Sequence, residues 1–227
     1  MKPIAIDLFC GLGGWTEGLL AEGYDVTGYD IEAHEYGDER YPAKLVLRDV
    51  LEIHGSEFTH AALIVASPPC QEYSYMAMPW SLAKAKAAAI RADTTGAELE
   101  RLNRLFNACF RIQREASEAA GRHIPLVVEN MRGAIPWVGR SRWNYGSFHL
   151  WGDVPALMPS NASGVKGFAG FKGFKDFHDC EAARKWSSGD PRRKAWSAQI
   201  AKIPLTLSRW IAEHYYPRDM VAIEVAA

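Results

Sequence analysis

Short apolar runs of strand length recur through the first 130 residues of the chain. They begin at residues 4, 24, 44, 61 and 125 and read "IAIDLF", "YDVTGYD", "KLVLRD", "AALIVAS" and "PLVVEN". Continuous apolar runs of this kind are typical of parallel strands that are buried on both faces of a sheet.

A different period separates the last two of these runs. Apolar side chains recur there at helical spacing, with charges between them and Gly121 as a stop signal; they are Leu99, Leu102, Phe106, Cys109 and Phe110. This spacing predicts an amphipathic crossover helix. Strands that alternate with helices predict an α/β fold with a doubly wound, mostly parallel sheet, in which ligands bind at the carboxyl ends of the strands.

The length of 227 residues suits one domain of ordinary size with a small insertion. We expect a core over residues 1–150 and, over residues 151–196, an insertion rich in Gly, Lys and Phe that has no helical or strand period. Residues 197–217 are expected to return to the core, with Pro204 near the start of a helix. Residues 218–227 are expected to form a tail.

Charge is divided unevenly along the chain. Residues 1–66 carry 4 Lys and Arg against 12 Asp and Glu, whereas the remaining residues carry 22 basic against 15 acidic side chains. The second part is therefore suited to a polyanion even though the net charge is only −1. The four cysteines have no CxxC spacing, and no apolar run approaches the length of a membrane span, so we expect a cytoplasmic protein without a membrane partner.

A glycine-rich turn, "DLFCGLGG", follows the first predicted strand. Gly11, Gly13 and Gly14 allow the backbone to turn tightly and to approach a ligand. Asp30 ends the next strand, where a carboxylate accepts hydrogen bonds from ribose hydroxyls, and Asp49 follows the third strand. Because the turn lacks the GxGxxG spacing of dinucleotide-binding proteins, the pattern favours a nucleoside-type ligand such as S-adenosylmethionine.

A cysteine follows two prolines in "ASPPCQEYS", at the end of the fourth predicted strand. A thiolate at Cys70 is a strong nucleophile, and its addition to carbon 6 of cytosine would make carbon 5 reactive toward a methyl group. Glu129 ends the next strand in "VVENMRG", where a carboxyl group is placed to hydrogen-bond ring nitrogen 3. The alternative for Cys70 is a buried structural thiol.

Together these motifs resemble those of the DNA (cytosine-5) methyltransferases. "DLFCGLGG", "SPPCQEYS", "VVENMRG" and "QIAKIPLTLSRWIA" resemble the family's cofactor loop, nucleophile loop, Glu-Asn motif and closing helix. The resemblance implies a compact, phage-like member with a Rossmann-like S-adenosylmethionine-dependent methyltransferase fold, whose residues 1–150 are catalytic and cofactor-binding. It implies that Cys70, Glu129, Arg140 and Arg142 are catalytic. The cofactor-binding residues it implies are Asp7, Phe9, Gly11, Gly13, Gly14, Asp30, Ile31, Asp49, Val50, Ser67, Pro69 and Lys202.

Two positions depart from the family pattern. The family's Arg-x-Arg lies well downstream of Glu-Asn, whereas Arg140 and Arg142 lie close to it. Lys202 stands where the closing motif normally reads Gly-Asn, and a cation there would suit carboxy-S-adenosylmethionine, which would make the enzyme carboxymethylate cytosine.

The expected partner is double-stranded DNA with a flipped cytosine, bound by a monomer without a metal. The segment after Cys70 is expected to be a loop whose Lys84, Lys86 and Arg91 meet phosphates. Basic and aromatic residues of the insertion are suited to backbone contact and base stacking; they are Lys166, Phe168, Phe171, Lys172, Phe174, Lys175, Phe177, Arg184, Lys185, Arg192, Arg193 and Lys194.

An insertion this small, in the place of a target-recognition domain, predicts a short or relaxed target sequence. The absence of an endonuclease motif favours a modification enzyme without its own nuclease. Three alternatives remain open from the sequence. They are a tRNA cytosine-5 methyltransferase, a catalytically silent regulator that binds nucleic acid, and a cofactor-binding module without nucleic acid.

Overall fold

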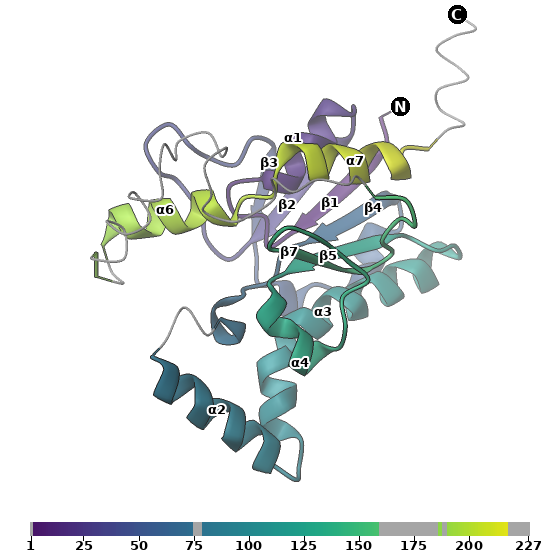
Figure 1. Ribbon diagram of the computed structural model, residues 1–227. Helices are drawn as coiled ribbons and strands as arrows, with labels where there is room; N and C mark the ends of the chain where they lie inside the picture. Colours follow the sequence, from purple (N-terminus) through teal and green to yellow (C-terminus); the bar gives the residue numbers. More distant parts are fainter. Residues whose placement is uncertain (1, 75–78, 159–185, 188–189, 218–227) are drawn as a thin grey trace, which may run out of the picture.

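The computed structural model describes residues 2–74, 79–158, 186–187 and 190–217. A seven-stranded sheet with the order β3-β2-β1-β4-β5-β7-β6 forms its centre (Figure 1). The strands are β1 (Ile4–Leu8), β2 (Asp25–Asp30), β3 (Lys44–Leu47), β4 (Ala61–Ala66), β5 (Leu126–Asn130), β6 (Trp143–Tyr145) and β7 (Phe148–Gly152). Only β7 runs in the direction opposite to the other six strands, so the predicted doubly wound, mostly parallel sheet is confirmed.

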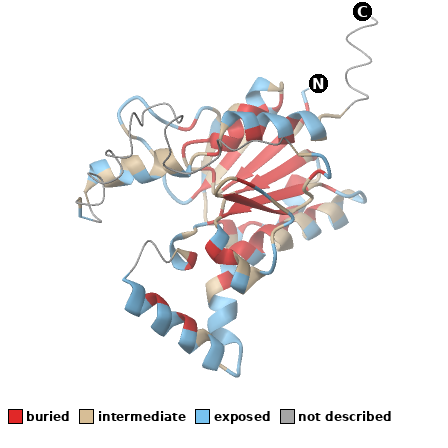
Figure 2. Cartoon of the chain, in the orientation of Figure 1, coloured by how far each residue is buried: buried red, intermediate tan, exposed pale blue. Residues whose placement is uncertain are grey.

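Helices cover both faces of the sheet. They are α1 (Gly14–Ala21), α2 (Trp80–Ala92), α3 (Ala97–Ala120), α4 (Ile135–Val138), α6 (Pro191–Ala201) and α7 (Leu205–Tyr215), with short 3₁₀ turns η1 (Val50–Glu52), η2 (Gly55–Phe58), η3 (Gln71–Tyr73) and η5 (Arg132–Ala134). Alternate side chains of each central strand enter one of two cores. One core lies against α3, and the other lies against α1 and α7 (Figure 2). This double burial explains the continuous apolar runs.

The predicted crossover helix is α3, which Gly96 and Gly121 bound in left-handed conformations. The predicted closing helix is α7, which begins directly after Pro204. It packs along α1, and the Tyr24 hydroxyl, just after α1, donates to the Ala212 carbonyl oxygen at 2.9 Å. The last described helix, α7, thus completes the core that β1 and α1 begin.

The prediction of a loop after Cys70 is wrong for residues 80–92, which form α2. Six alanines and no glycine or proline lie within this segment, and alanine has the highest helix propensity. Only Ala83 and Ala87 of α2 are buried, so the helix projects from the body of the molecule (Figures 1 and 2).

The proposed boundary at residue 150 falls within β7, which continues to Gly152. The expected end of the insertion at residue 196 falls within α6, which occupies residues 191–201. The residues from Lys166 to Lys185 that we expected to contact nucleic acid lie outside the described residues, as does the expected tail. None of the described helices is both long and apolar enough to cross a membrane.

Candidate active site

The site lies at the carboxyl edge of the sheet, where the strand order reverses. From β1 the chain moves outward to β2 and β3, and it then returns to β4 on the other side of β1. In open α/β sheets, ligands bind at such a switch point. The glycine-rich turn follows β1 and the Cys70 loop follows β4, so both predicted loops flank it.

The glycine-rich turn has open space on one side and tight packing on the other. A Cβ atom at Gly11 would meet no atom within 4 Å, whereas one at Gly14 would lie 2.3 Å from the backbone nitrogen of Ile203. Phe9 has a φ of 57°, a left-handed conformation that is costly for a side chain of this size. The turn is therefore held in a strained shape against the α6–α7 connection, with its outer side accessible.

A buried polar network supports this turn from below. Asp7 on β1 is 1% exposed, and its Oδ2 accepts a hydrogen bond from the Thr16 hydroxyl at 2.7 Å. The Thr16 oxygen lies 2.6 Å from the Tyr41 hydroxyl, whereas Oδ1 of Asp7 has no hydrogen-bond partner among the described residues. Burial raises the pKa of Asp7 to about 8, with a further contribution from the charge of Asp30. Asp7 thus lies beneath the turn, not on its outer side.

Asp30 ends β2 beside the turn, as the sequence predicted. Its Oδ2 accepts from the backbone N–H of Gly11 at 2.9 Å, and its Oδ1 accepts from that of Ile31 at 2.8 Å. Burial raises the pKa of Asp30, but hydrogen bonds from His34 and Gly11 outweigh burial and hold it below its usual value. The carboxylate is ionised at neutral pH, and the neighbouring Ile31 side chain is 72% exposed.

The third strand end differs from the prediction in detail. Asp49 lies after β3 and caps η1, since its Oδ1 accepts from the backbone N–H of Leu51 at 2.9 Å. The Val50 side chain is buried in the core against α3, so only its backbone remains for a ligand contact.

The Cys70 loop is fastened to the cofactor side through its first residue. The backbone N–H of Ser67 donates to the Leu8 carbonyl oxygen at 3.1 Å, and the indole N–H of Trp15 donates to the Ser67 hydroxyl at 3.0 Å. Pro68 is buried, Pro69 is exposed and Cys70 is half-buried. By contrast, Cys10 and Cys109 are buried, and burial raises their thiol pKa values well above the ordinary one.

The Glu129 strand end meets the Cys70 loop directly. Glu129 is 3% exposed, and the Asn130 side-chain amide donates to the Pro68 carbonyl oxygen at 2.9 Å. Beyond β5, a Cβ atom at Gly133 would lie only 2.2 Å from the Tyr73 carbonyl oxygen. The structure therefore brings the two loops expected to carry the chemistry into backbone contact.

Behind this contact, Tyr73 anchors the end of the loop. Its hydroxyl donates to the Asn103 side-chain oxygen at 3.0 Å, and the Asn103 amide donates to the Trp137 carbonyl oxygen at 2.8 Å. Burial raises the pKa of Tyr73 well above its ordinary value, so the phenol stays protonated.

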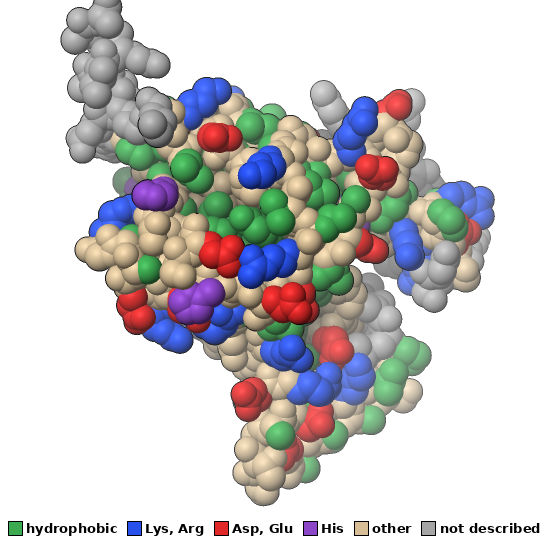
Figure 3. Space-filling view, turned by 180° about the vertical axis from the view of Figure 1, so that it is seen from behind, with side chains coloured by type: hydrophobic (Ala, Val, Ile, Leu, Met, Phe, Trp, Pro, Cys, Tyr) green, Lys and Arg blue, Asp and Glu red, His purple; other side chains and the backbone are tan. Residues whose placement is uncertain are grey.

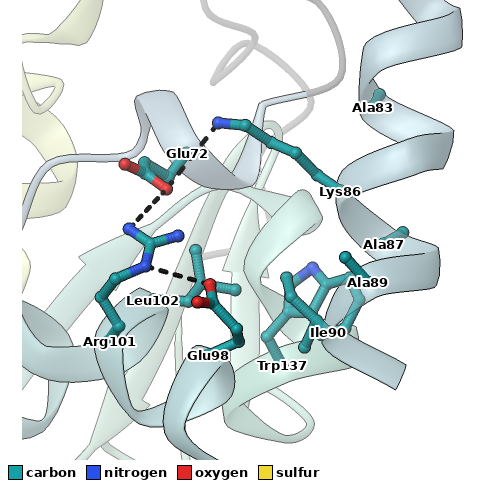
Figure 4. A pocket seen from close by; sticks show the side chains of 10 residues that line it. All are labelled: Glu72, Ala83, Lys86, Ala87, Ala89, Ile90, Glu98, Arg101, Leu102 and Trp137. Atoms are coloured by element: carbon teal, nitrogen blue, oxygen red, sulfur yellow. Dashed lines mark hydrogen bonds and ion pairs between the residues drawn. The ribbon is translucent and has the colours of Figure 1, made fainter. Parts of the chain in front are cut away.

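A pocket of about 520 Å³, partly open to solvent, separates α2 from α3 and α4 (Figure 4). Glu72, two residues after Cys70, lies at its rim, with Arg101 at 3.5 Å and Lys86 at 3.9 Å. Acidic and basic side chains are interspersed over this projecting part of the molecule (Figure 3). Exposed ion pairs of this kind contribute little, so α2 is weakly attached.

Two further predicted groups lie at the margin. Arg140 and Arg142 are exposed on the segment between α4 and β6. Lys202 ends α6, and its ammonium pairs with Glu17 of α1 at 2.5 Å and lies 3.9 Å from Glu39. Glu17 and Glu39 thus already balance the positive charge of Lys202. The carboxy-S-adenosylmethionine hypothesis expected this charge to pair with an acidic cofactor instead.

The residues at this edge fit a nucleoside cofactor. Gly11 leaves open space, the ionised Asp30 offers acceptor oxygens, and Ile31 presents an exposed apolar side chain. No cluster of His, Cys, Asp or Glu suited to a metal ion occurs among the described residues.

The sequence did not single out Trp15, Thr16, His34 or Tyr41 as site residues, and it used Asn130 only as part of a motif. Asn130 had a signal, because it directly follows Glu129. Tyr41 had none, since its partner Thr16 lies 25 residues away.

Comparison with known proteins agrees with these motifs. Residues 4–88 match the family model of C-5 cytosine-specific DNA methylases. The Type II methyltransferase M.FnuDI of Fusobacterium nucleatum is 32% identical over 72 residues, which cover 30% of this chain and 21% of that protein. The Type II methylase M.HgiDII of Herpetosiphon aurantiacus is 31% identical over 83 residues, or 33% of this chain and 23% of that protein. The chain thus matches about a fifth of the length of these curated relatives.

Solved structures are more distant. A DNA modification methyltransferase encoded within an E. coli prophage matches with a TM-score of 0.39 and 21% identity, over 59% of this chain and 33% of the other. The S. pombe Dnmt2 methyltransferase matches with a TM-score of 0.35 and 13% identity, over 60% and 36%.

Proposed function

We propose that this chain methylates carbon 5 of cytosine in DNA, because its residues 4–88 match the family model of the C-5 cytosine-specific DNA methylases. One observation carries the proposal. The Pro-Cys-Gln loop after β4 and the Glu-Asn end of β5 meet through the hydrogen bond from Asn130 to Pro68. A nucleophile and an acid on neighbouring strand ends are the two groups that this chemistry requires.

In the proposed mechanism, the Cys70 thiolate adds to carbon 6 of a flipped cytosine, while Glu129 hydrogen-bonds ring nitrogen 3 and stabilises the charge that develops there. The electron pair that reaches carbon 5 makes this atom nucleophilic. Once carbon 5 has gained the methyl group that the donor would supply, a base would remove the carbon 5 proton. The electron pair of that C–H bond would re-form the double bond between carbons 5 and 6 as the thiolate leaves. Arg140 and Arg142 would contact the base and a nearby phosphate.

The methyl donor of the proposal is S-adenosylmethionine, which supplies an electrophilic methyl group. Asp30 would hold its ribose, Ile31 and Phe9 would flank the adenine, and the backbone of Asp49 and Val50 would meet the adenine edge. The turn from Gly11 to Gly14 would enclose the remainder, with Ser67 and Pro69 on the nucleophile side. Lys202 would hold the α6–α7 connection against α1, since it pairs with Glu17.

The testing experiment traps the proposed covalent adduct. DNA containing 5-fluorocytosine is incubated with the protein and S-adenosylmethionine, and adducts are measured by denaturing gel and intact mass. Fluorine cannot leave as a proton does, so we expect an adduct that carries one added methyl group. Cys70→Ser should abolish it, whereas Cys109→Ala, which removes a buried thiol in α3, should retain it.

The possible results of this experiment distinguish the proposed function from the alternative functions. An adduct that persists in Cys70→Ser contradicts the assigned nucleophile. No adduct with DNA but methyl transfer to tRNA, measured with tritiated cofactor, contradicts DNA as the substrate. Cofactor binding without transfer to either nucleic acid favours the silent regulator.

A further inference from the structure

Asp30 has a side-chain partner that the proposed function does not use. His34 lies on the connection between β2 and β3, and its Nε2 is 3.6 Å from Oδ1 of Asp30. Its other ring nitrogen, Nδ1, is 3.3 Å from the Tyr36 hydroxyl. The His34 side chain is 21% exposed, so it lies against the carboxylate and not in bulk solvent.

Backbone N–H groups already use half of the acceptor positions of Asp30. Each carboxylate oxygen can accept about two hydrogen bonds. Oδ2 accepts from Gly11 N–H, and Oδ1 accepts from Ile31 N–H, so one position remains on each oxygen. A ribose would bring two hydroxyl donors to these two positions. His34 Nε2 lies 3.6 Å from Oδ1, so a hydroxyl donor that approaches this oxygen meets the His34 ring as a competing partner.

We propose that His34 competes with a ribose hydroxyl for Oδ1 of Asp30, so that the nucleoside cofactor binds with displacement of the His34 ring and release of its proton. This inference rests on the proposed function, because it assumes that the cofactor's ribose is held by Asp30. It adds a residue that sets cofactor affinity and makes that affinity depend on pH.

The charges around His34 determine the sign of this dependence. The hydrogen bond to Asp30 raises the pKa of His34, burial lowers it, and the charges of Asp30 and Glu32, the latter 3.8 Å away, raise it further. Lys194 of α6 opposes them, and the Tyr36 hydroxyl faces Nδ1. The net result is a pKa above the ordinary value of histidine.

Below this pKa the imidazolium pairs with Asp30, and the ribose must displace a cation. Above this pKa the ring is neutral, so the ribose hydroxyl displaces it from Asp30 at a lower cost in free energy. Once displaced, the ring returns to the ordinary pKa of histidine. Cofactor affinity should therefore rise with pH between that value and the raised pKa of His34 and level off on either side, with up to about a tenfold change for each pH unit in this window.

The test measures binding of S-adenosylhomocysteine to the full chain by titration calorimetry between about pH 5 and pH 9, the range in which histidines titrate. Repeating the titration in buffers of different protonation enthalpy counts the protons released. We expect release of up to one proton per ligand between the ordinary pKa of histidine and the raised pKa of His34, and none at either extreme of pH. His34→Gln should bind with similar affinity at every pH.

A matched control is His60→Gln, at an exposed histidine just before the amino end of β4 and so at the opposite edge of the sheet. It should keep the wild-type pH profile. Flat wild-type affinity, proton uptake on binding, or an unchanged slope in His34→Gln would overturn the inference while leaving the cofactor in place. Failure to bind at every pH would remove the proposed cofactor itself, and with it the inference.

Discussion

The two halves of the carboxyl edge are held together by different forces. On the β1–β2 side, buried carboxyl groups support the backbone, through the bonds of Asp7 to Thr16 and of Asp30 to Gly11. On the β4–β5 side, neutral groups do so, through the bond of Asn130 to Pro68 and the contact of Gly133 with Tyr73.

This difference separates two kinds of sensitivity. Buried carboxyl groups change charge with pH, so the cofactor side should respond to protons. Neutral amides and close backbone contacts do not titrate, so the nucleophile side should respond to displacements of shape. The predictions below test each side in turn.

The largest effect is expected from Asp7→Asn on the cofactor side. Burial raises the pKa of Asp7 from its ordinary value of 3.8 to about 8 in the folded protein, so the folded state retains a proton that the unfolded chain loses. The free energy of unfolding should therefore fall as pH rises from about 4 to 8, and by linkage this amounts to roughly 6 kcal/mol. Asn at this position should remove most of that slope.

Urea unfolding at several pH values measures this effect. Asp25→Asn is the control, because Asp25 is exposed at the other end of the neighbouring strand β2. It should leave the slope unchanged. An Asp7→Asn variant that keeps the wild-type slope would show that other groups cause it.

The next effect is expected from Gly133→Ala on the nucleophile side. The new methyl group would lie 2.2 Å from the Tyr73 carbonyl oxygen, so the Glu129 and Cys70 loops must separate. A shift of about 1 Å costs on the order of 100-fold in rate. Single-turnover methyl transfer should fall accordingly.

Gly121→Ala is the matched control, since its φ of 65° makes the substitution strained but a Cβ atom there meets nothing within 4 Å. It should lose about 1 kcal/mol of stability and keep its methyl-transfer rate. Equal loss of rate in both variants would argue against a specific role for the Gly133 contact.

Trp15→Phe should have a smaller effect at the junction of the two halves. It keeps a ring in the core but removes the indole N–H that donates to Ser67. A neutral hydrogen bond contributes about 1 kcal/mol, which predicts roughly a fivefold lower rate of methyl transfer. In a double-mutant cycle, Ser67→Ala should give the same loss, and the double variant should lose no more. Additive losses would mean that the two residues act separately.

The smallest effect is expected from Glu72→Gln, at the exposed contact of the Cys70 loop with α2 and α3. It weakens the pairs with Arg101 and Lys86, which are exposed, so the stability change should stay below about 1 kcal/mol. Hydrogen exchange should nevertheless quicken in α2, and the difference from wild type should shrink at high salt. Faster exchange in α3 instead would show that Glu72 stabilises the core.

The sequence predicted the sheet because its central strands are buried on both faces, which leaves continuous apolar runs. It predicted α3 because this helix buries one face and leaves the other exposed. It missed α2 because that helix buries only two alanines and has no apolar period to detect. It missed the hairpin of β6 and β7. Only three residues form β6, which lies at the edge of the sheet, and His149 interrupts the apolar run of β7.

The site residues also divide into those that have a local signal in the sequence and those that have none. Asp30 and Glu129 were found because each ends an apolar run, and Cys70 was found because it follows two prolines. Thr16 and Tyr41 were missed, since their bond depends on packing between segments that are distant in sequence. The roles of the proposed catalytic and cofactor residues remain predictions until they are tested.

The pairing of α1 with α7 has a consequence for how the protein is made. The Tyr24 hydroxyl bonds to a carbonyl group 188 residues later, and Trp15 and Leu19 are covered only when α7 arrives. A ribosome therefore synthesises almost the whole described chain before one face of the sheet is closed. Until then, the nascent protein exposes an apolar surface to which chaperones can bind.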